Sequence, residues 1–216
     1  MATSYESNFV RLGGALAVVM PFILSASFAV GVVLQTAAGQ TYYCLSNLGV
    51  SSVPYVPYFF NVPLIVSGIA VIIFAVALTR VVRGGRLFLA GAGLLIMSGV
   101  FVSLVGVFTR ANPGLHSFVS NTQFAIFPIS VILIGVSFLR NGMRREGFVS
   151  VVIPIVTVPL GLFANYGPLF TDHACAASEW TAALGLSAWL IWMGLNLPRL
   201  ATRGAKSVPQ DVSALS

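Results

Sequence analysis

Long apolar runs alternate with short polar segments along the whole chain. Each run is close to the roughly 20 apolar residues that a helix needs to cross the hydrocarbon core of a bilayer. The runs are residues 12–34, 58–79, 87–108, 117–139, 148–170 and 179–197. This pattern predicts an all-α, polytopic membrane protein, in which residues 1–216 form a single domain built as a bundle of six transmembrane helices.

The first run has two interpretations. Ser25, Ala26 and Ser27 are small residues of the kind found at a signal-peptide cleavage site. The run is longer, however, than the roughly 7–15 apolar residues at the centre of a signal peptide. We therefore expect it to be retained as the first transmembrane helix.

The charged residues support the same topology. They make up 7% of the chain, against about 25% of a soluble domain, so a water-facing surface is excluded for most of it. Of the 11 basic residues, all but Arg110 fall on one side of the predicted membrane. These ten are Arg11, Arg80, Arg83, Arg86, Arg140, Arg144, Arg145, Arg199, Arg203 and Lys206. Because basic residues concentrate in cytoplasmic loops, we expect a plasma-membrane protein with both termini in the cytoplasm, and not a nucleic-acid-binding protein.

The segment from Gln35 to Pro57 is the longest stretch outside the predicted helices. It is uncharged and contains several tyrosines, so we expect it to lie at the membrane surface, where tyrosine is enriched. Cys44 lies in this segment and Cys175 in the last outer loop. A disulfide between the two loops and a pair of free thiols are both compatible with this placement.

Most of the other polar residues that could bind a ligand or take part in a reaction also fall on the outer side. In the first hypothesis they form a binding pocket, because polar groups at membrane depth are costly and often functional. Arg110 would then face an anion, such as a lipid headgroup or a small solute. The rest of the lining would come from Asn47, Asn61, Asn112 and His116.

Two other hypotheses compete for the same residues. His116, His173 and Asp172, with Glu179 as a further ligand, have the right types to hold a zinc ion in a metal-dependent hydrolase. Their spacing matches no known metal-binding signature. Asp172 and His173 are also adjacent in the chain, so their side chains cannot easily point toward the same metal ion. Alternatively, the polar residues form a structural rim that caps helix ends and satisfies the backbone near prolines.

The third run contains Gly91, Gly93 and Gly99, with Ser103 one turn after the last of them. Such small residues predict close helix packing. If the protein is instead a structural subunit of a complex, the face from Gly99 to Ser103 and the tryptophans of the sixth run would contact the partner.

Several short motifs resemble the DUF998 family of multi-pass membrane proteins in their order and spacing. They are Ser46–Gly49, Phe60–Asn61, Ser98–Phe101, Asn112–His116 and Phe124. The resemblance implies a six-helix membrane protein and little chemistry, because the function of the family is unknown. It favours Asn47, Asn61 and His116 among the polar residues, although the family motif has an acidic residue where this chain has Asn47.

The sequence therefore predicts an integral membrane protein of unassigned, non-enzymatic activity with an outward-facing polar pocket. The hydrolase and the structural subunit remain the alternatives. Membrane lipids are the expected partners, within a bundle that can form homo- or hetero-oligomers, and no cofactor is expected.

Overall fold

The structure, a computed structural model, describes residues 4–82, 84–166 and 174–206 of the chain, and all regular secondary structure in these ranges is helical. The helices are α1 (Ser4–Ala37), η1 (Leu45–Val50, a short 3₁₀ helix), α2 (Val56–Val81), α3 (Arg86–Val107), α4 (Pro113–Arg140), α5 (Arg144–Tyr166) and α6 (Ala174–Lys206). The six α-helices are all long and apolar enough to cross a membrane. The predicted polytopic all-α bundle is thus confirmed.

The helix boundaries differ from those predicted mainly at the ends. The turn signal at Asn112 and Pro113 begins α4 directly, four residues before the predicted start. Asn112 is the N-cap, its Oδ1 accepting a hydrogen bond from the backbone N–H of Leu115 at 3.3 Å. Proline is well suited to the first helical position because no intrahelical partner is lost there. The predicted end of the fifth helix, at Phe170, lies outside the described residues.

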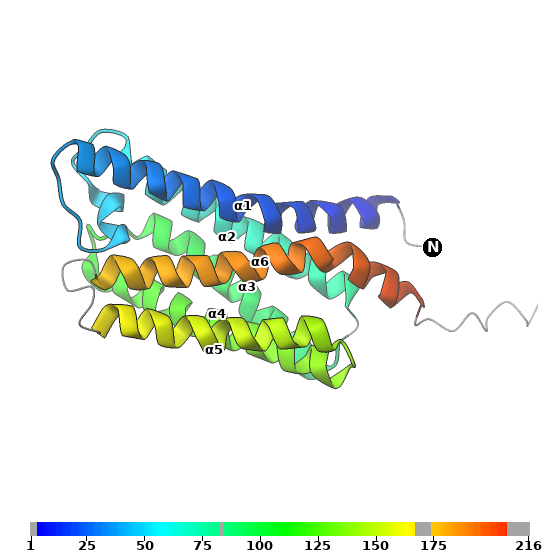
Figure 1. Cartoon of the computed structure of the whole chain (residues 1–216). Coiled ribbons are helices and arrows are strands. Elements are labelled where there is room, and N and C mark those ends of the chain that lie inside the picture. The colour runs from blue at the N-terminus through cyan, green and yellow to red at the C-terminus, as the bar shows by residue number, and fades with distance from the viewer. Residues whose placement is uncertain (1–3, 83, 167–173, 207–216) are drawn as a thin grey trace, which may run out of the picture.

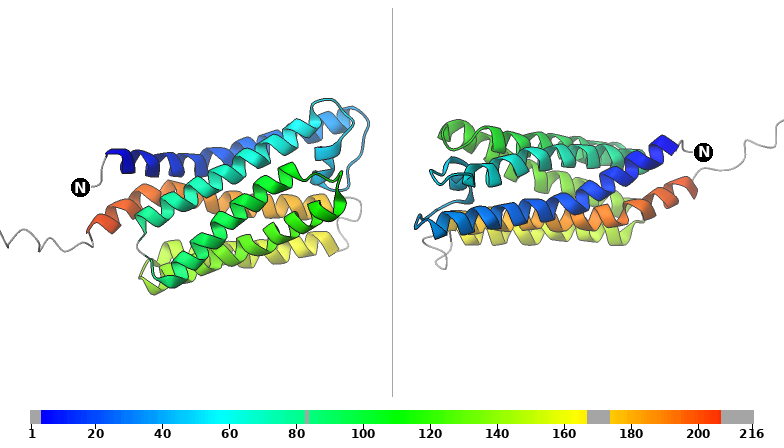
Figure 2. Two further views of the ribbon diagram at one scale, coloured as in Figure 1. Left: turned by 180° about the vertical axis from the view of Figure 1, so that it is seen from behind. Right: turned by 90° about the horizontal axis from the view of Figure 1, so that it is seen from above.

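The six α-helices form a closed ring in which each packs against its neighbours along the chain and α6 returns to α1. The first described turn of α1 and the last of α6 lie at the same end of the bundle (Figure 1). The two further views show η1 folded against the opposite end (Figure 2). Large side chains such as Trp189, Phe74 and Phe138 are fully buried between the helices. Aliphatic side chains such as Leu160 are exposed on the outside, where lipid would cover them.

The small residues of α3 pack inside the bundle. A Cβ atom placed on Gly99 would lie 2.7 Å from the carbonyl oxygen of Gly68 in α2. Ser103 donates a hydrogen bond to the carbonyl oxygen of Ile65 at 2.9 Å. The close packing predicted from these residues is therefore confirmed for Gly91, Gly99 and Ser103, and it is wrong for Gly93, where an added Cβ would meet no atom within 4 Å. The proposed partner face is not confirmed, because α2 of the same chain occupies the face from Gly99 to Ser103.

The contact between α4 and α5 is tight in one half only. A Cβ atom on Gly135 would lie 2.8 Å from Cβ of Ser150, and one on Gly147 would lie 2.8 Å from the carbonyl oxygen of Gly135. Nearer to η1, beyond Pro128 and Pro154, the facing sides of these helices line a cavity instead. The two helices thus touch closely at the end that holds the termini and leave space between them at the other.

The segment between α1 and α2 folds onto one end of the bundle, with part of it buried and Tyr43 and Tyr55 exposed. Cys44, Leu45 and Leu48 are buried, each with at most 1% of its surface exposed. The η1 helix contacts α1, α2 and α6, so it closes one end of the bundle. The apolar side chains of η1 explain this packing, because they gain from burial between the helix ends. The position of the segment at the membrane surface stays a prediction.

Candidate functional site

A cavity of about 600 Å³ lies inside the η1 end of the bundle. Its walls come from all six α-helices and from η1. Its polar lining is Ser46, Arg110, His116, Ser117, Ser120, Asn121, Gln123, Thr157, Asn165, Tyr166, Ser178 and Glu179. Its apolar lining includes Leu24, Phe28, Phe60, Leu64, Val102, Phe124, Val158, Leu162 and Leu186. The space is of a size that small-molecule sites commonly have.

Helical periodicity explains why three helices each present one face to this cavity. In α6 the lining residues recur at spacings of three and four, and the same holds for α5 and for most of α4. For α6 they are Cys175, Ser178, Glu179, Ala182, Ala183 and Leu186. Residues three and four apart share one side of a helix. On α6 the polar members come first, so this wall is polar near η1 and apolar deeper in the bundle.

The polar end of the cavity is organised around Ser46. Its backbone N–H donates to Oε2 of Glu179 at 3.1 Å, and its hydroxyl donates to Oε1 at 2.9 Å. Nη1 of Arg110 approaches the oxygen of the same hydroxyl at 3.5 Å. Arg110 lies near enough to the Glu179 carboxylate for a Coulombic attraction. The serine therefore stands between the two charged groups and contacts both.

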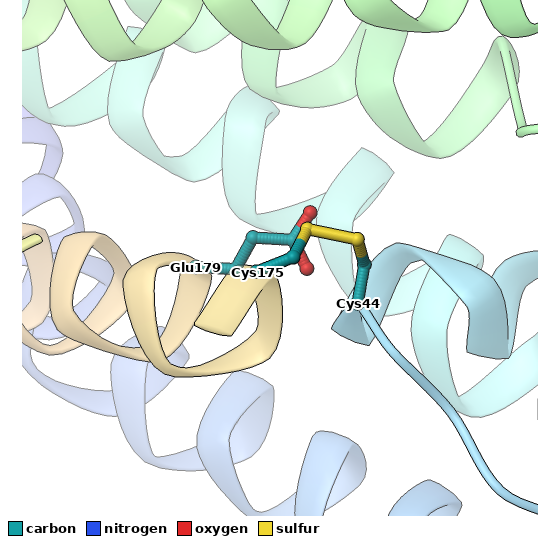
Figure 3. Close-up of side chains that lie close together, drawn as sticks. All are labelled: Cys44, Cys175 and Glu179. Atoms are coloured by element: carbon teal, nitrogen blue, oxygen red, sulfur yellow. A yellow bond between two sulfur atoms is a disulfide. The ribbon is translucent and has the colours of Figure 1, made fainter. Parts of the chain in front are cut away.

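A disulfide joins the same two segments. Cys44 and Cys175 are bonded, with their Cα atoms 4.8 Å apart. Cys175 lies one helical turn before Glu179, and Figure 3 shows the carboxylate next to the sulfur–sulfur bond. Next to it, the backbone N–H of Ala176 donates to the carbonyl oxygen of Tyr43 at 3.0 Å. The covalent bond and these hydrogen bonds hold η1 on the first turns of α6.

The disulfide also bears on metal binding. Ligand atoms of Cys44, Cys175 and Glu179 lie within 4.8 Å of one another. A cysteine binds metal as a thiolate, and here both sulfurs are used in the disulfide. This cluster is therefore a covalent cross-link beside a carboxylate. His173 and Asp172, the other residues of the metal hypothesis, lie outside the described residues.

His116 lines the cavity and also holds the turn between α3 and α4. Its Nδ1 lies 2.7 Å from the carbonyl oxygen of Phe108, the residue that follows α3. A carbonyl oxygen only accepts, so Nδ1 must carry the proton. In the neutral ring this leaves Nε2 as an acceptor. The imidazole, 4% exposed, thus has a fixed tautomer and a fixed place beside Arg110.

The three asparagines expected in the pocket do not line the cavity. Asn47 accepts a hydrogen bond from the backbone N–H of Cys44 at 2.8 Å, which closes the turn into η1. Asn61 donates from Nδ2 to the carbonyl oxygen of Gly49 at 3.0 Å, and Asn112 caps α4. Of the five expected residues, Arg110 and His116 are on the wall, and the asparagines shape the backbone that carries it.

These contacts give the residues from Ser46 to Gly49 separate physical roles. Ser46 holds Glu179, and the Asn47 side chain closes a local turn. Leu48 is fully buried. A Cβ atom on Gly49 would lie 2.6 Å from Oδ1 of Asn61 and 3.0 Å from Cδ1 of Phe60, so a larger residue there would push on both side chains. An acidic residue in place of Asn47 would still supply the oxygen acceptor that the turn needs.

Sequence reasoning did not identify the link between Arg110, Ser46 and Glu179. Glu179 was considered only as an extra metal ligand. The sequence does contain a hint of this link. Arg110 is the one basic residue on its side of the predicted membrane, and Glu179 is one of few acidic residues on that side. A buried cation in a membrane usually has a carboxylate near it.

No curated protein and no solved structure matches this chain. A family model does match, over residues 16–196, and its description is a protein of unknown function. The match spans most of all six apolar helices and includes both half-cystines and the cavity. The chain therefore belongs to the DUF998 family.

Proposed function

We propose that this membrane protein binds a phospholipid, with the headgroup at the polar end of the cavity and an acyl chain along its apolar wall. The cavity supports this because its two ends differ in character. Arg110, Ser46 and Glu179 line one end. Leucine, valine and phenylalanine side chains make up much of the remaining wall, with uncharged polar side chains such as Asn121 and Thr157 between them. An amphipathic ligand would satisfy both parts at once.

Arg110 is the observation that carries the proposal. A guanidinium offers five N–H donors, yet its hydrogen bond within the described part of the chain is a single long one to Ser46, at 3.5 Å. No described carboxylate lies within ion-pair distance of it. A charged group at membrane depth is costly when it lacks partners. A phosphate oxygen in the cavity would accept from the remaining donors and lower that cost.

The gap between α4 and α5 supports a ligand that comes from the bilayer. Phe124 on α4 and Leu162 and Tyr166 on α5 line the cavity, and each is also exposed. Side chains that are both exposed and part of the cavity wall mark a side opening between these helices. An acyl chain could leave through it into the surrounding lipid. A water-soluble solute would gain nothing from such an opening.

The test compares Arg110→Gln with Arg140→Gln, a matched control that removes an exposed arginine from the last turn of α4. Each purified protein is titrated in detergent micelles with phosphatidylglycerol and with phosphatidylethanolamine, and the bound lipid is counted by native mass spectrometry. We expect Arg110→Gln to lower affinity at least about tenfold, as loss of a charge-assisted hydrogen bond does. Arg140→Gln should match the wild type.

Two results would contradict the proposal. One is equal lipid affinity in the wild type and Arg110→Gln. The other is equally tight binding of glycerophosphoglycerol, which has a phospholipid headgroup and no acyl chain. That second result would identify a site for a small solute.

We also propose that the protein lies in the plasma membrane with both termini in the cytoplasm. The support is the distribution of basic residues. Among those whose side chains the structure describes, Arg110 follows α3 near η1, and Arg11, Arg80, Arg86, Arg140, Arg144, Arg145 and Arg199 lie toward the opposite end (Figure 1). A protease added to intact cells should then leave a C-terminal epitope tag uncleaved. Removal of the tag without permeabilisation would reverse the orientation.

A further inference from the structure

The two charged groups at the polar end of the cavity are separated by a serine. Ser46 donates to both oxygens of Glu179, and its hydroxyl oxygen receives Nη1 of Arg110. A direct, two-fold arginine–carboxylate pair would join the two charges to each other. Here the carboxylate instead accepts from the backbone N–H groups of Leu45 and Ser46 and from the Ser46 hydroxyl. It keeps room for a further donor, and most of the guanidinium donors have no partner among the described residues.

The position of the carboxylate is rigid. Glu179 lies one turn after Cys175, and Ser46 lies two residues after Cys44, so the disulfide fixes the backbone on both sides of the hydrogen bonds. Figure 3 shows Glu179 beside that bond. A group held in place before binding costs a ligand less entropy than one that must be ordered. The site therefore presents a positive and a negative group at a fixed spacing.

We propose that the site selects a zwitterionic headgroup with a primary ammonium, in which the phosphate meets Arg110 and the N–H groups of the ammonium meet Glu179. An ethanolamine phosphate headgroup has this chemistry. An ammonium has three N–H donors, and one of them can bond a remaining lone pair of the carboxylate. An anionic headgroup such as phosphoglycerol would place uncharged hydroxyl groups against Glu179, so the negative charge of the carboxylate would not be balanced by the ligand. This inference rests on the lipid-binding function proposed above and specifies the class of lipid.

An alternative role for Glu179 is to balance the charge of Arg110 without touching a ligand. In that case the carboxylate would favour every phosphate-containing lipid equally, through the position of Arg110. The two roles therefore differ in headgroup selectivity and not in the overall affinity for lipid. Selectivity can be measured on the unmodified protein, so the test does not depend on a variant that folds.

The experiment uses vesicles that contain either phosphatidylethanolamine or phosphatidylglycerol with the same palmitoyl and oleoyl chains, each diluted into phosphatidylcholine. Purified wild-type protein is reconstituted, and the retained lipid is counted after extraction into detergent. We expect the wild type to retain phosphatidylethanolamine at least about tenfold more than phosphatidylglycerol. Glu179→Gln, which keeps the shape of the side chain and one acceptor oxygen and removes the charge, should abolish that preference and leave phosphatidylglycerol unchanged or increased.

Equal retention of the two lipids by the wild type would overturn the inference while leaving the lipid-binding function intact. A Glu179→Gln protein that loses both lipids in equal proportion would also overturn it, since that is the behaviour of a charge-balancing residue. Retention of neither lipid by the wild type would instead refute the proposed function itself. Thermal unfolding of Glu179→Gln, measured alongside, separates lost selectivity from lost folding.

Discussion

Removal of the disulfide should lower stability while leaving the helices inserted. The double substitution Cys44→Ser and Cys175→Ser deletes a cross-link between residues 131 apart in the sequence. In the chain-entropy description, closing a loop of that length stabilises the folded state by about 5 kcal/mol at 25 °C. This figure is an upper bound, because a membrane already confines the unfolded chain.

Contacts that survive the substitution keep η1 on α6 in the variant. The two hydrogen bonds between Ser46 and Glu179 and the backbone bond from Ala176 to Tyr43 do not need the sulfur atoms. Each is worth on the order of 1 kcal/mol. We therefore expect a net loss of about 2–4 kcal/mol, the usual range for a disulfide. For a chain of this size that corresponds to a fall in Tm on the order of 10 °C.

The assay is thermal unfolding in a mild detergent, followed by intrinsic tryptophan fluorescence. Wild-type protein treated with a reductant should reproduce the Tm of the double variant, and the double variant should be insensitive to the reductant. The single variants control for the cost of placing serine at each buried site. A double variant whose Tm stays within about 2 °C of the oxidised wild type would refute the reasoning, since that shift is below 1 kcal/mol.

Other substitutions test the cavity and the contact between α4, α5 and α6. Gly161→Leu should reduce lipid affinity at least about tenfold, because Gly161 lines the cavity and the leucine side chain would fill part of it. The Tm should not change, since the atom nearest to an added Cβ is the carbonyl oxygen of Ser178 at 3.9 Å. Unchanged lipid retention would contradict this. Gly135→Ala should destabilise the bundle by about 1–3 kcal/mol through overpacking, since the new Cβ would lie 2.8 Å from Cβ of Ser150; an unaltered Tm would count against it. Trp189→Phe removes the 2.9 Å hydrogen bond from Nε1 to the Ser150 hydroxyl and should cost about 1 kcal/mol, measured as a lower Tm than that of the wild type.

The candidate site was only partly accessible to sequence reasoning. Arg110 could be selected because its charge is isolated on one side of the membrane. Asn61 was selected for its polarity, yet its side chain serves the backbone of Gly49. An asparagine that lines a cavity and one that satisfies a backbone carbonyl have the same sequence signal. Only the position of neighbouring backbone groups distinguishes them.

The link between Ser46 and Glu179 was inaccessible for a different reason. The two residues are 133 positions apart, and no local periodicity connects η1 with the first turns of α6. The polarity and turn residues of the segment from Gln35 to Pro57 do not reveal that η1 packs between α1, α2 and α6. That packing brings together helices from both ends of the chain.

The sequence by itself determined the class of protein, the number of membrane-spanning helices and their approximate limits. Each of these follows from local hydrophobicity, because a helix in lipid satisfies its backbone hydrogen bonds internally and needs no partner to be recognised. The tertiary structure alone decided which polar groups face the cavity, which half of α4 and α5 remains apart, and that Cys44 meets Cys175. Those features depend on contacts between distant segments, which form only when the helices pack against one another.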